Sequence, residues 1–466
     1  MKLPKILAAI LDIAEPSPDR SNRATWGDRY NNLPEDRAIP QSERLAAISE
    51  CRDLVRNSAV ARGIVERVRN IVTGTTGILP ESNSGDKAWD DKAEALWREW
   101  AADPEGTGRS DLADIQGLLA ASTLTDGGTL VALNQDGSIT LIEPDRLKPD
   151  PAGRALDQPY KLDPQGRVTA WCVHTKALNP YDKDAVEWLD ARRCLTLFVR
   201  NRADQILPYP QFSACALTLR DIEELNRYTL RQAKVQSCAA AIHKRGPSGE
   251  SPFRLRGVAD SGRDKEEEGA QRFEKATGMT VIDTDGDYNT LAPATPSSTY
   301  DSFMKHNLRL VAMAVGLPYE FLALYFADGT YSSSKATMTQ AREAVAYRQR
   351  HLKRAILTPL WQWQVARWTA LGLLPPAPAG ATVRWRDPAF EWMDVKDGVQ
   401  TDLLEAQAGL RSMQDLAAKR GADYETLLRR RAAEIKTLQT VAEEYGLDPA
   451  ALSSISLPGA AKPANS

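Results

Sequence analysis

Residues 316–335 read GLPYEFLALYFADGTYSSSK, and this stretch decides how the rest of the chain is interpreted. Its glycines, its proline and its run of three serines are typical of a loop. The stretch contains two acidic residues, Glu320 and Asp328, and no basic residue before Lys335. Apolar residues recur at helical spacing on both sides of it. We therefore predict a flexible, uncharged to acidic loop over 316–334, held between two helices.

Three long helices are predicted near this loop. Helical periodicity marks 299–315 before it and 335–372 after it. The second of these contains Pro359, which removes a backbone donor and clashes with the preceding turn, so we expect a bend there. A further helix is predicted over 211–243, because no glycine or proline interrupts that segment. About 30 residues of helix would be roughly 45 Å long, which suits a strut or a member of a bundle.

The first half of the chain is predicted to be α+β. Helical periodicity begins at Ser42 and ends at a pair of glycines, and a second amphipathic helix covers 86–100. The Asp136-Gly137 pair lies between two apolar runs, which is a strong hairpin signal. Further strands are predicted at 167–175 and 194–200. The fold class expected for the whole chain is mixed α+β, mainly helical, with an antiparallel sheet in the first half.

The other segments are polar or helical. Residues 246–298 are broken by Gly, Pro and Ser, with a short charged helix expected at 264–277 and a strand at 279–283. The return at 373–395 contains Pro and Trp, and one short strand is expected in it. Three helices are expected over 396–411, 412–420 and 423–445, the last capped by Asp423, and the tail after them has a composition typical of disorder.

Composition narrows the classes of function. Net charge is −3, whereas a protein that grips duplex DNA usually has a basic excess. Five cysteines, an odd number with no CxxC pair, are typical of a reducing cytoplasm, and no zinc-ligand spacing occurs. There is no apolar run of membrane-spanning length, so no membrane partner is expected.

The N-terminus is predicted to be an arm. The opening MKLPKILAAILDIAE has a short apolar run that Asp12 interrupts, which favours an amphipathic arm over a signal peptide. Residues 16–40 are rich in Pro, Asp, Arg and Asn and suit either an extended arm ordered by a partner or a frayed terminus.

The sequence contains no complete catalytic motif. There is no GxxxxGK[ST] motif and therefore no phosphate-cradling loop. Ser332–Lys335 matches SxxK, but its companion motifs are missing, and serines before a helix are typical of an N-cap. The acidic run at 283–287 fails the calcium-loop pattern, because Tyr288 stands where glycine is required. No catalysis, cofactor or metal is expected.

Four groups of residues together resemble the portal family of lambda-type phages, from about Arg52 onward. Each group is weak alone, but their order and spacing are strong. The groups are Arg52, Arg56-Asn57, Ala61, Asn70-Ile71-Val72, Gly74 and Gly77; Ile142–Leu147, which reads IEPDRL; Gly316–Glu320 followed by Tyr331-Ser332-Ser333; and Trp385-Arg386, Pro388, Asp394, Lys396, Gly409-Leu410, Arg420-Gly421 and Asp423-Tyr424.

The resemblance implies a closed ring of about twelve subunits at one capsid vertex, assembled in the host bacterial cytoplasm. It implies partners as well: double-stranded DNA in the channel, the terminase large subunit, a head–tail adaptor and the major capsid protein. The implied parts are an arm (1–45), a wing (46–210), a first stem helix (211–243), a clip (244–298), a second stem helix (299–315), a tunnel loop (316–334), a long channel-side helix (335–372), a wing return (373–395), a modest helical crown (396–445) and a flexible tail (446–466).

The resemblance also assigns candidate site residues. We expect the tunnel loop to touch DNA through short neutral or acidic groups, because each basic contact to phosphate would add drag to the moving duplex. Alternatively, the two tyrosines of the loop pack between subunits. The tunnel-loop candidates are Tyr325, Asp328, Thr330, Tyr331 and Ser332; the clip and partner-docking candidates are Arg263, Asp264, Lys265, Glu266, Glu267 and Glu268; and the candidates for a subunit interface or a structural role are Arg342, Arg348, Arg350 and Arg354.

Two other classes of protein remain open at this stage. A terminase-like DNA-processing enzyme would need a Walker motif or a cluster of metal-binding carboxylates. A host-side interaction or scaffolding protein would form no channel. The choice between phage, prophage and gene transfer agent is also open.

Overall fold

The computed structural model describes residues 35–153, 158–175, 185–244, 273–276, 279–284, 300–325, 330–388, 395–419 and 422–445. The chain is mainly helical, with four small sheets among the described residues. The helices are α2 (Glu35–Ala38), α3 (Gln41–Asn57), α4 (Ala59–Thr73), α5 (Lys87–Ala101), α6 (Leu112–Thr125), α7 (Ala216–Cys238), α8 (Tyr300–Val315), α9 (Tyr319–Ala323), α10 (Tyr331–Leu352), α11 (Thr358–Ala370), α12 (Val395–Gln407), α13 (Met413–Lys419) and α14 (Tyr424–Tyr445). None of these helices combines the length and the apolar character needed to cross a bilayer.

The strands form three antiparallel sheets and one mixed sheet. The sheet orders are β1-β11, β3-β2-β7, β4-β5-β6 and β8-β10-β9, with β8 and β10 parallel. The strands are β1 (Leu79–Asn83), β2 (Gly128–Leu133), β3 (Ile139–Ile142), β4 (Tyr160–Leu162), β5 (Val168–Thr175), β6 (Ala185–Asp190), β7 (Cys194–Phe198), β8 (Ala239–Lys244), β9 (Phe273–Ala276), β10 (Met279–Thr284) and β11 (Thr382–Arg386).

The N-terminal helical pattern is divided into two helices. Ser58 has an extended backbone and ends α3, and its hydroxyl accepts from the Ala61 N–H at 3.2 Å to cap α4. Uninterrupted periodicity from Ser42 had suggested no break, because an N-cap serine does not disturb the spacing of apolar residues. α6 was also not predicted, since it is buried on most sides and shows almost no amphipathic stripe.

The central sheet confirms the predicted hairpin. β2 pairs with β3 around the Asp136-Gly137 turn, in a register that sets Leu133 opposite Ile139. On its other edge β2 pairs with β7. Gly128 has φ +138°, and a Cβ there would lie 1.7 Å from the carbonyl oxygen of Leu197, so no other residue fits.

Two tryptophans unite segments that are distant in sequence. β1 pairs with β11, so residues 79–83 lie beside residues 382–386. Trp97 of α5 is 2% exposed and lies 5.2 Å, centroid to centroid, from Trp361 of α11. The strand predicted in the return at 373–395 is therefore β11, and it closes against the N-terminal half.

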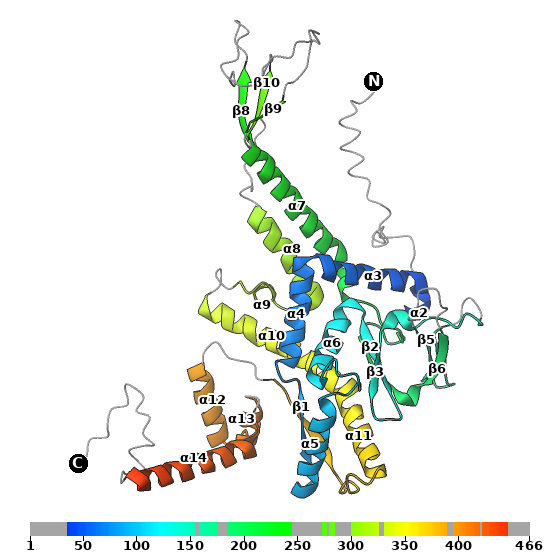
Figure 1. Cartoon of the computed structure of the whole chain (residues 1–466), viewed down its shortest axis with the longest axis vertical. Helices are drawn as coiled ribbons and strands as arrows, with labels where there is room; N and C mark the ends of the chain where they lie inside the picture. Colours follow the sequence, from blue (N-terminus) through cyan, green and yellow to red (C-terminus); the bar gives the residue numbers. More distant parts are fainter. Residues whose placement is uncertain are drawn as a thin grey trace.

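α7 and α8 pack together and extend away from the body (Figure 1). α8 spans Tyr300–Val315, as its periodicity predicted. The helix predicted over 211–243 is too long, because a 3-10 turn precedes α7, and from Ala239 the chain forms β8. Pairing of β8 with β10 supplies backbone hydrogen bonds that override the helical propensity of its alanines.

The small sheet beside α7 tests two further predictions. The helix expected over 264–277 is wrong at its end, because Phe273–Ala276 is β9 and pairs with β10. β10 confirms the strand expected at 279–283. The clip candidates at 263–268 lie outside the described residues.

The helix after the 316–335 stretch is interrupted, as predicted, but one turn earlier than Pro359. A π-helical segment at Lys353–Leu357 separates α10 from α11. Its wider turn precedes the proline, which occupies the first turn of α11, where its missing N–H costs least. Figure 1 shows α11 leaving the line of α10 at this point.

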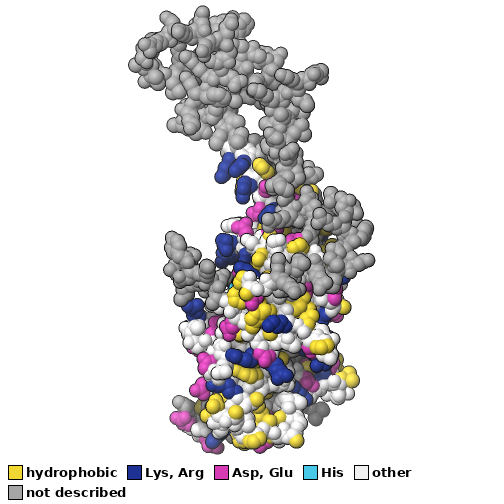
Figure 2. All heavy atoms as spheres, turned by 90° about the vertical axis from the view of Figure 1, so that its right-hand side faces the viewer, with side chains coloured by type: hydrophobic (Ala, Val, Ile, Leu, Met, Phe, Trp, Pro, Cys, Tyr) yellow, Lys and Arg dark blue, Asp and Glu magenta, His cyan; other side chains and the backbone are white. Residues whose placement is uncertain are grey.

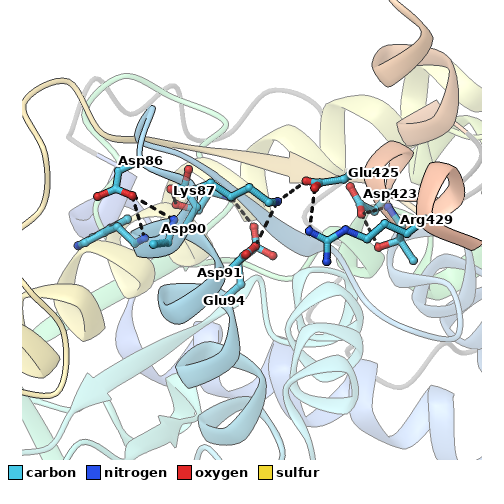
Figure 3. A network of polar contacts seen from close by, with 12 residues as sticks. Asp86, Lys87, Asp90, Asp91, Glu94, Asp423, Glu425 and Arg429 are labelled. Carbon is cyan, nitrogen blue, oxygen red and sulfur yellow. Dashed lines mark hydrogen bonds and ion pairs between the residues drawn. The ribbon is translucent and has the colours of Figure 1, made fainter.

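The three C-terminal helices confirm the predicted pattern, and polar contacts join them to α5 and β1. Asp423 caps α14 by accepting from the Thr426 N–H at 2.8 Å. Lys87 of α5 ion-pairs with Glu425, which in turn pairs with Arg429 at 3.0 Å (Figure 3). Gln414 donates to Glu81 at 2.6 Å.

Candidate DNA-facing segment

The segment begins where α8 ends in a glycine cap. Gly316 has φ +73°, and its N–H donates to the carbonyls of Ala312 and Met313 at 2.9 and 3.1 Å. The Leu317 N–H donates to the carbonyl of Ala312 at 3.1 Å, and its side chain is buried. This ending satisfies the last carbonyls of α8 and fixes the direction in which the chain leaves.

A short helix, rather than an open loop, follows the cap. α9 begins after Pro318, whose fixed φ suits a helix start, and it buries Phe321. Leu324 adopts a left-handed backbone with φ 52° and ends the helix. The prediction of a continuous loop over 316–334 is therefore wrong here, because the glycine and proline mark the ends of a helix.

The far end of the segment is also helical earlier than expected. α10 begins at Tyr331, where Lys335 was predicted, because the serines form its first turn. The hydroxyl of Thr330 caps this turn by accepting from the Ser333 N–H at 3.3 Å. Thr330 and Ser332 are exposed, and Ser334 is buried.

Two basic residues of α8 lie against tyrosines of the segment. The Lys305 ammonium is 4.8 Å from the ring centroid of Tyr325 and pairs with Asp301 at 2.9 Å. The Arg309 guanidinium is 5.4 Å from the ring centroid of Tyr319. Burial raises the pKa of Tyr319, so this phenol stays neutral at physiological pH. Both basic residues of α8 are thus engaged by aromatic faces, and Lys305 also by a carboxylate.

Arg348 supports the segment from behind. Its Nη2 donates to the carbonyl oxygen of Val315, in the last turn of α8, at 2.6 Å. Its Nη1 lies 3.4 Å from Oε1 of Gln211. A cation at a helix C-terminus also interacts favourably with the helix dipole. This arginine therefore ties α10 to the end of α8 within one chain.

Some of the candidate tunnel-loop and interface residues lie on helices, and others lie outside the described residues. Tyr325 and Thr330 flank positions 326–329, which include Asp328 and lie outside the described residues. Tyr331 is the first residue of α10. Of the other arginines on and after α10, Arg342 is partly buried, and Arg350 and Arg354 are exposed.

Sequence reasoning missed the roles of Lys305 and Arg309. The spacing of Asp301 and Lys305, i and i+4 on a helix, could have predicted their ion pair. Contact with the tyrosines depends on how α9 folds back on α8, which has no sequence signal. Within the described ranges, no three His, Cys, Asp or Glu side chains are placed to hold a metal ion.

Exposed basic side chains lie along the outer part of α7. Figure 2 shows Lys and Arg side chains on the narrow part of the molecule where α7 rises, and acidic and basic side chains mixed over the broader body. Arg227, Arg231 and Lys234 are exposed along α7.

A family model described as phage portal protein, lambda family, matches residues 23–349. The chain belongs to the lambda family of phage portal proteins. The match includes the whole candidate segment and ends within α10. No curated protein matches this portal protein in sequence.

Solved structures with some likeness to this portal protein include chains of gene transfer agent (GTA) particles. A chain of the neck of an empty GTA particle, computed with C6 symmetry, has a TM-score of 0.41 and 14% identity, covering 86% of this chain and 97% of that one. A chain of the virion of a native GTA particle has a TM-score of 0.40 and 14% identity, covering 89% and 98%. A chain of the neck of a native GTA particle, computed with C12 symmetry, has a TM-score of 0.42 and 14% identity, covering 88% and 96%.

Proposed function

We propose that this portal protein forms a closed ring of about twelve subunits at one capsid vertex and conducts double-stranded DNA through its centre. In this proposal the ring docks the terminase large subunit during packaging and the head–tail adaptor afterwards, and it contacts the major capsid protein. Its work is mechanical and requires no catalysis by the chain.

The observation that carries the proposal is the charge of the segment 316–334. It has no Lys or Arg, although basic residues stand on both sides of it. A protein that holds DNA neutralises phosphates, and each such contact strengthens binding. A segment without such groups lets a duplex pass in both directions with little resistance.

The geometry fits a channel lining in a second respect. Tyr325 is 38% exposed, and Lys305 lies over its ring, so the cation is directed to an aromatic face. Thr330 and Ser332 present short neutral hydroxyls to solvent. We assign Tyr325, Asp328, Thr330, Tyr331 and Ser332 to the channel surface.

The paired helices α7 and α8 fit the stem of such a ring. They are packed against each other, and the hydroxyl of Tyr300 hydrogen-bonds to Asn226 between them. Exposed apolar side chains remain on them, among them Leu230 on α7 and Met313 on α8. Such exposed groups are typical of a surface covered on assembly. We assign residues 46–210 to a wing, 244–298 to a clip and 396–445 to a crown.

Negative-stain electron microscopy of the purified full chain tests the proposal. We expect rings with a central hole, in classes with rotational symmetry. Monomers or filaments at protein concentrations that saturate assembly would refute the ring, and with it the channel.

A further inference from the structure

A cavity of about 380 Å³ lies beside the junction of α8 and α10. Val315 and Gly316 line it from the end of α8, and Leu197 lines it from β7. Tyr347, Arg348 and His351 line it from α10. Its volume is in the range of pockets that hold small ligands or a single side chain.

The charge in this cavity is unbalanced. Arg348 is partly buried, and burial lowers the pKa of its guanidinium. Among the described residues, no carboxylate lies within ion-pair distance of it, and no Asp or Glu lines the cavity. Arg200, which is exposed and donates to the carbonyl of Ala203, also lines the cavity. The guanidinium donates to the carbonyl of Val315 and lies near the amide oxygen of Gln211, but it has no carboxylate partner, so an incoming anion would add a charge-assisted pair.

His351 leaves a second polar group unused in the same cavity. Its Nε2 is buried and has no hydrogen-bond partner among the described residues. Buried polar atoms are nearly always hydrogen-bonded, so this Nε2 is available to a hydrogen-bonding group that enters the cavity. Gly316 leaves open space on its side, because nothing lies within 4 Å of the position its Cβ would take.

We propose that this cavity is a binding site for a carboxylate carried on an apolar stem. The guanidinium of Arg348 would pair with the carboxylate, Arg200 would stand at its side, and Nε2 of His351 would complete the polar end. Val315 and Leu197 would contact the stem. The site is distinct from the channel surface and does not depend on how that surface meets DNA.

The shape of the cavity favours a carboxylate over a DNA phosphate. A phosphodiester is part of a stiff duplex backbone, which a cavity set between helices does not admit. A carboxylate has two sources, a free organic acid or an acidic side chain of a second copy of this chain. Tyr347 beside the cavity is 72% exposed, and Met313 of α8 is 77% exposed, so a second copy of the chain has exposed surface on which to pack near the cavity. The experiment below therefore distinguishes the two sources.

Calorimetry on the full chain, with hexanoate and its uncharged analogue hexanamide, tests the chemistry. We expect hexanoate to bind with a Kd of about 1 mM and hexanamide at least about 10-fold more weakly, because charge-assisted hydrogen bonds are lost. Ala344→Trp fills the cavity and should abolish binding, whereas Ala346→Trp, on an exposed position of the same helix, should not. Arg348→Met removes the charge and should equalise the two ligands.

The wild-type comparison decides the proposal even if a variant fails to fold. Equal affinity for the two ligands, no binding of hexanoate up to about 20 mM, or equal loss in both tryptophan variants would overturn it. Displacement of hexanoate by a short DNA duplex would assign the cavity to phosphate and overturn it as well. Binding to monomers but not to rings would identify an acidic side chain of the second copy as the occupant, and binding to both would identify a free acid.

Discussion

If the segment lines a DNA channel, as we propose, a lysine at position 332 should make the ring retain DNA. Ser332 is exposed on the first turn of α10, so Ser332→Lys can present its ammonium to solvent without displacing a core group. Every subunit of a ring gains one charge. A duplex has two phosphate backbones, so we expect at least about two simultaneous new contacts at any position of the DNA.

The magnitude follows from counterion release. Each phosphate contact adds about −0.9 to the slope of log K against log salt concentration, so two contacts add about −1.8. Between about 200 and 50 mM salt, the affinity of variant rings for duplex DNA should rise about 12-fold more than that of wild-type rings. Packaging and ejection should slow in parallel.

Fluorescence anisotropy of a short labelled duplex, titrated with purified rings at several salt concentrations, measures this slope. Ala432→Lys is the matched control, because it adds the same charge to an exposed position on α14. Identical slopes for wild-type and Ser332→Lys rings would refute the assignment of Ser332 to the channel. An equal change in the control would show that net charge, and not position, is responsible.

Three further predictions concern the body of the molecule. Trp97→Ala should lower the free energy of unfolding by about 3–5 kcal/mol in urea titrations, and Trp97→Phe by clearly less, because the indole fills the contact between α5 and α11. Burial lowers the pKa of His351 in the folded state, so the unfolded state takes up the proton first and stability is lost as pH falls below about 6.5. His351→Gln should reduce the loss of stability that urea unfolding measures between about pH 7.5 and pH 5.5. An unchanged loss would contradict this. Lys87→Ala should speed hydrogen exchange at the start of α14, because the ion pair with Glu425 is lost. High salt should have the same effect on the wild type. Lys92→Ala, at an exposed position of α5, is the control.

Local signals predicted the elements that depend on local chemistry. α8 and the hairpin around Asp136 were predicted because amphipathic spacing and turn residues act over a few positions. α6 was missed because burial on most sides removes the stripe that marks a helix. β8 and β9 were missed because their pairing with β10 joins residues that no local pattern connects.

The candidate segment shows the same division. Its lack of basic residues is a property of composition and could be recognised in the sequence. Its secondary structure was predicted as a loop, because Gly316 and Pro318 punctuate it, whereas here they end one helix and start the next. The roles of Lys305 and Arg348 require α8, α9 and α10 to be placed in space.

Hydrogen bonds and packing within the chain hold this segment in position. At one end, the Gly316 cap directs the chain, and Arg348 fixes the last turn of α8 through the carbonyl of Val315. At the other end, the first turn of α10 buries Ser334, and the helix continues into the core through Val345. If the segment lines the channel as proposed, force from a moving duplex would pass into a close-packed interior, which deforms little. A segment fastened in this way needs no ionic contact with DNA to keep its place, so its surface can remain neutral.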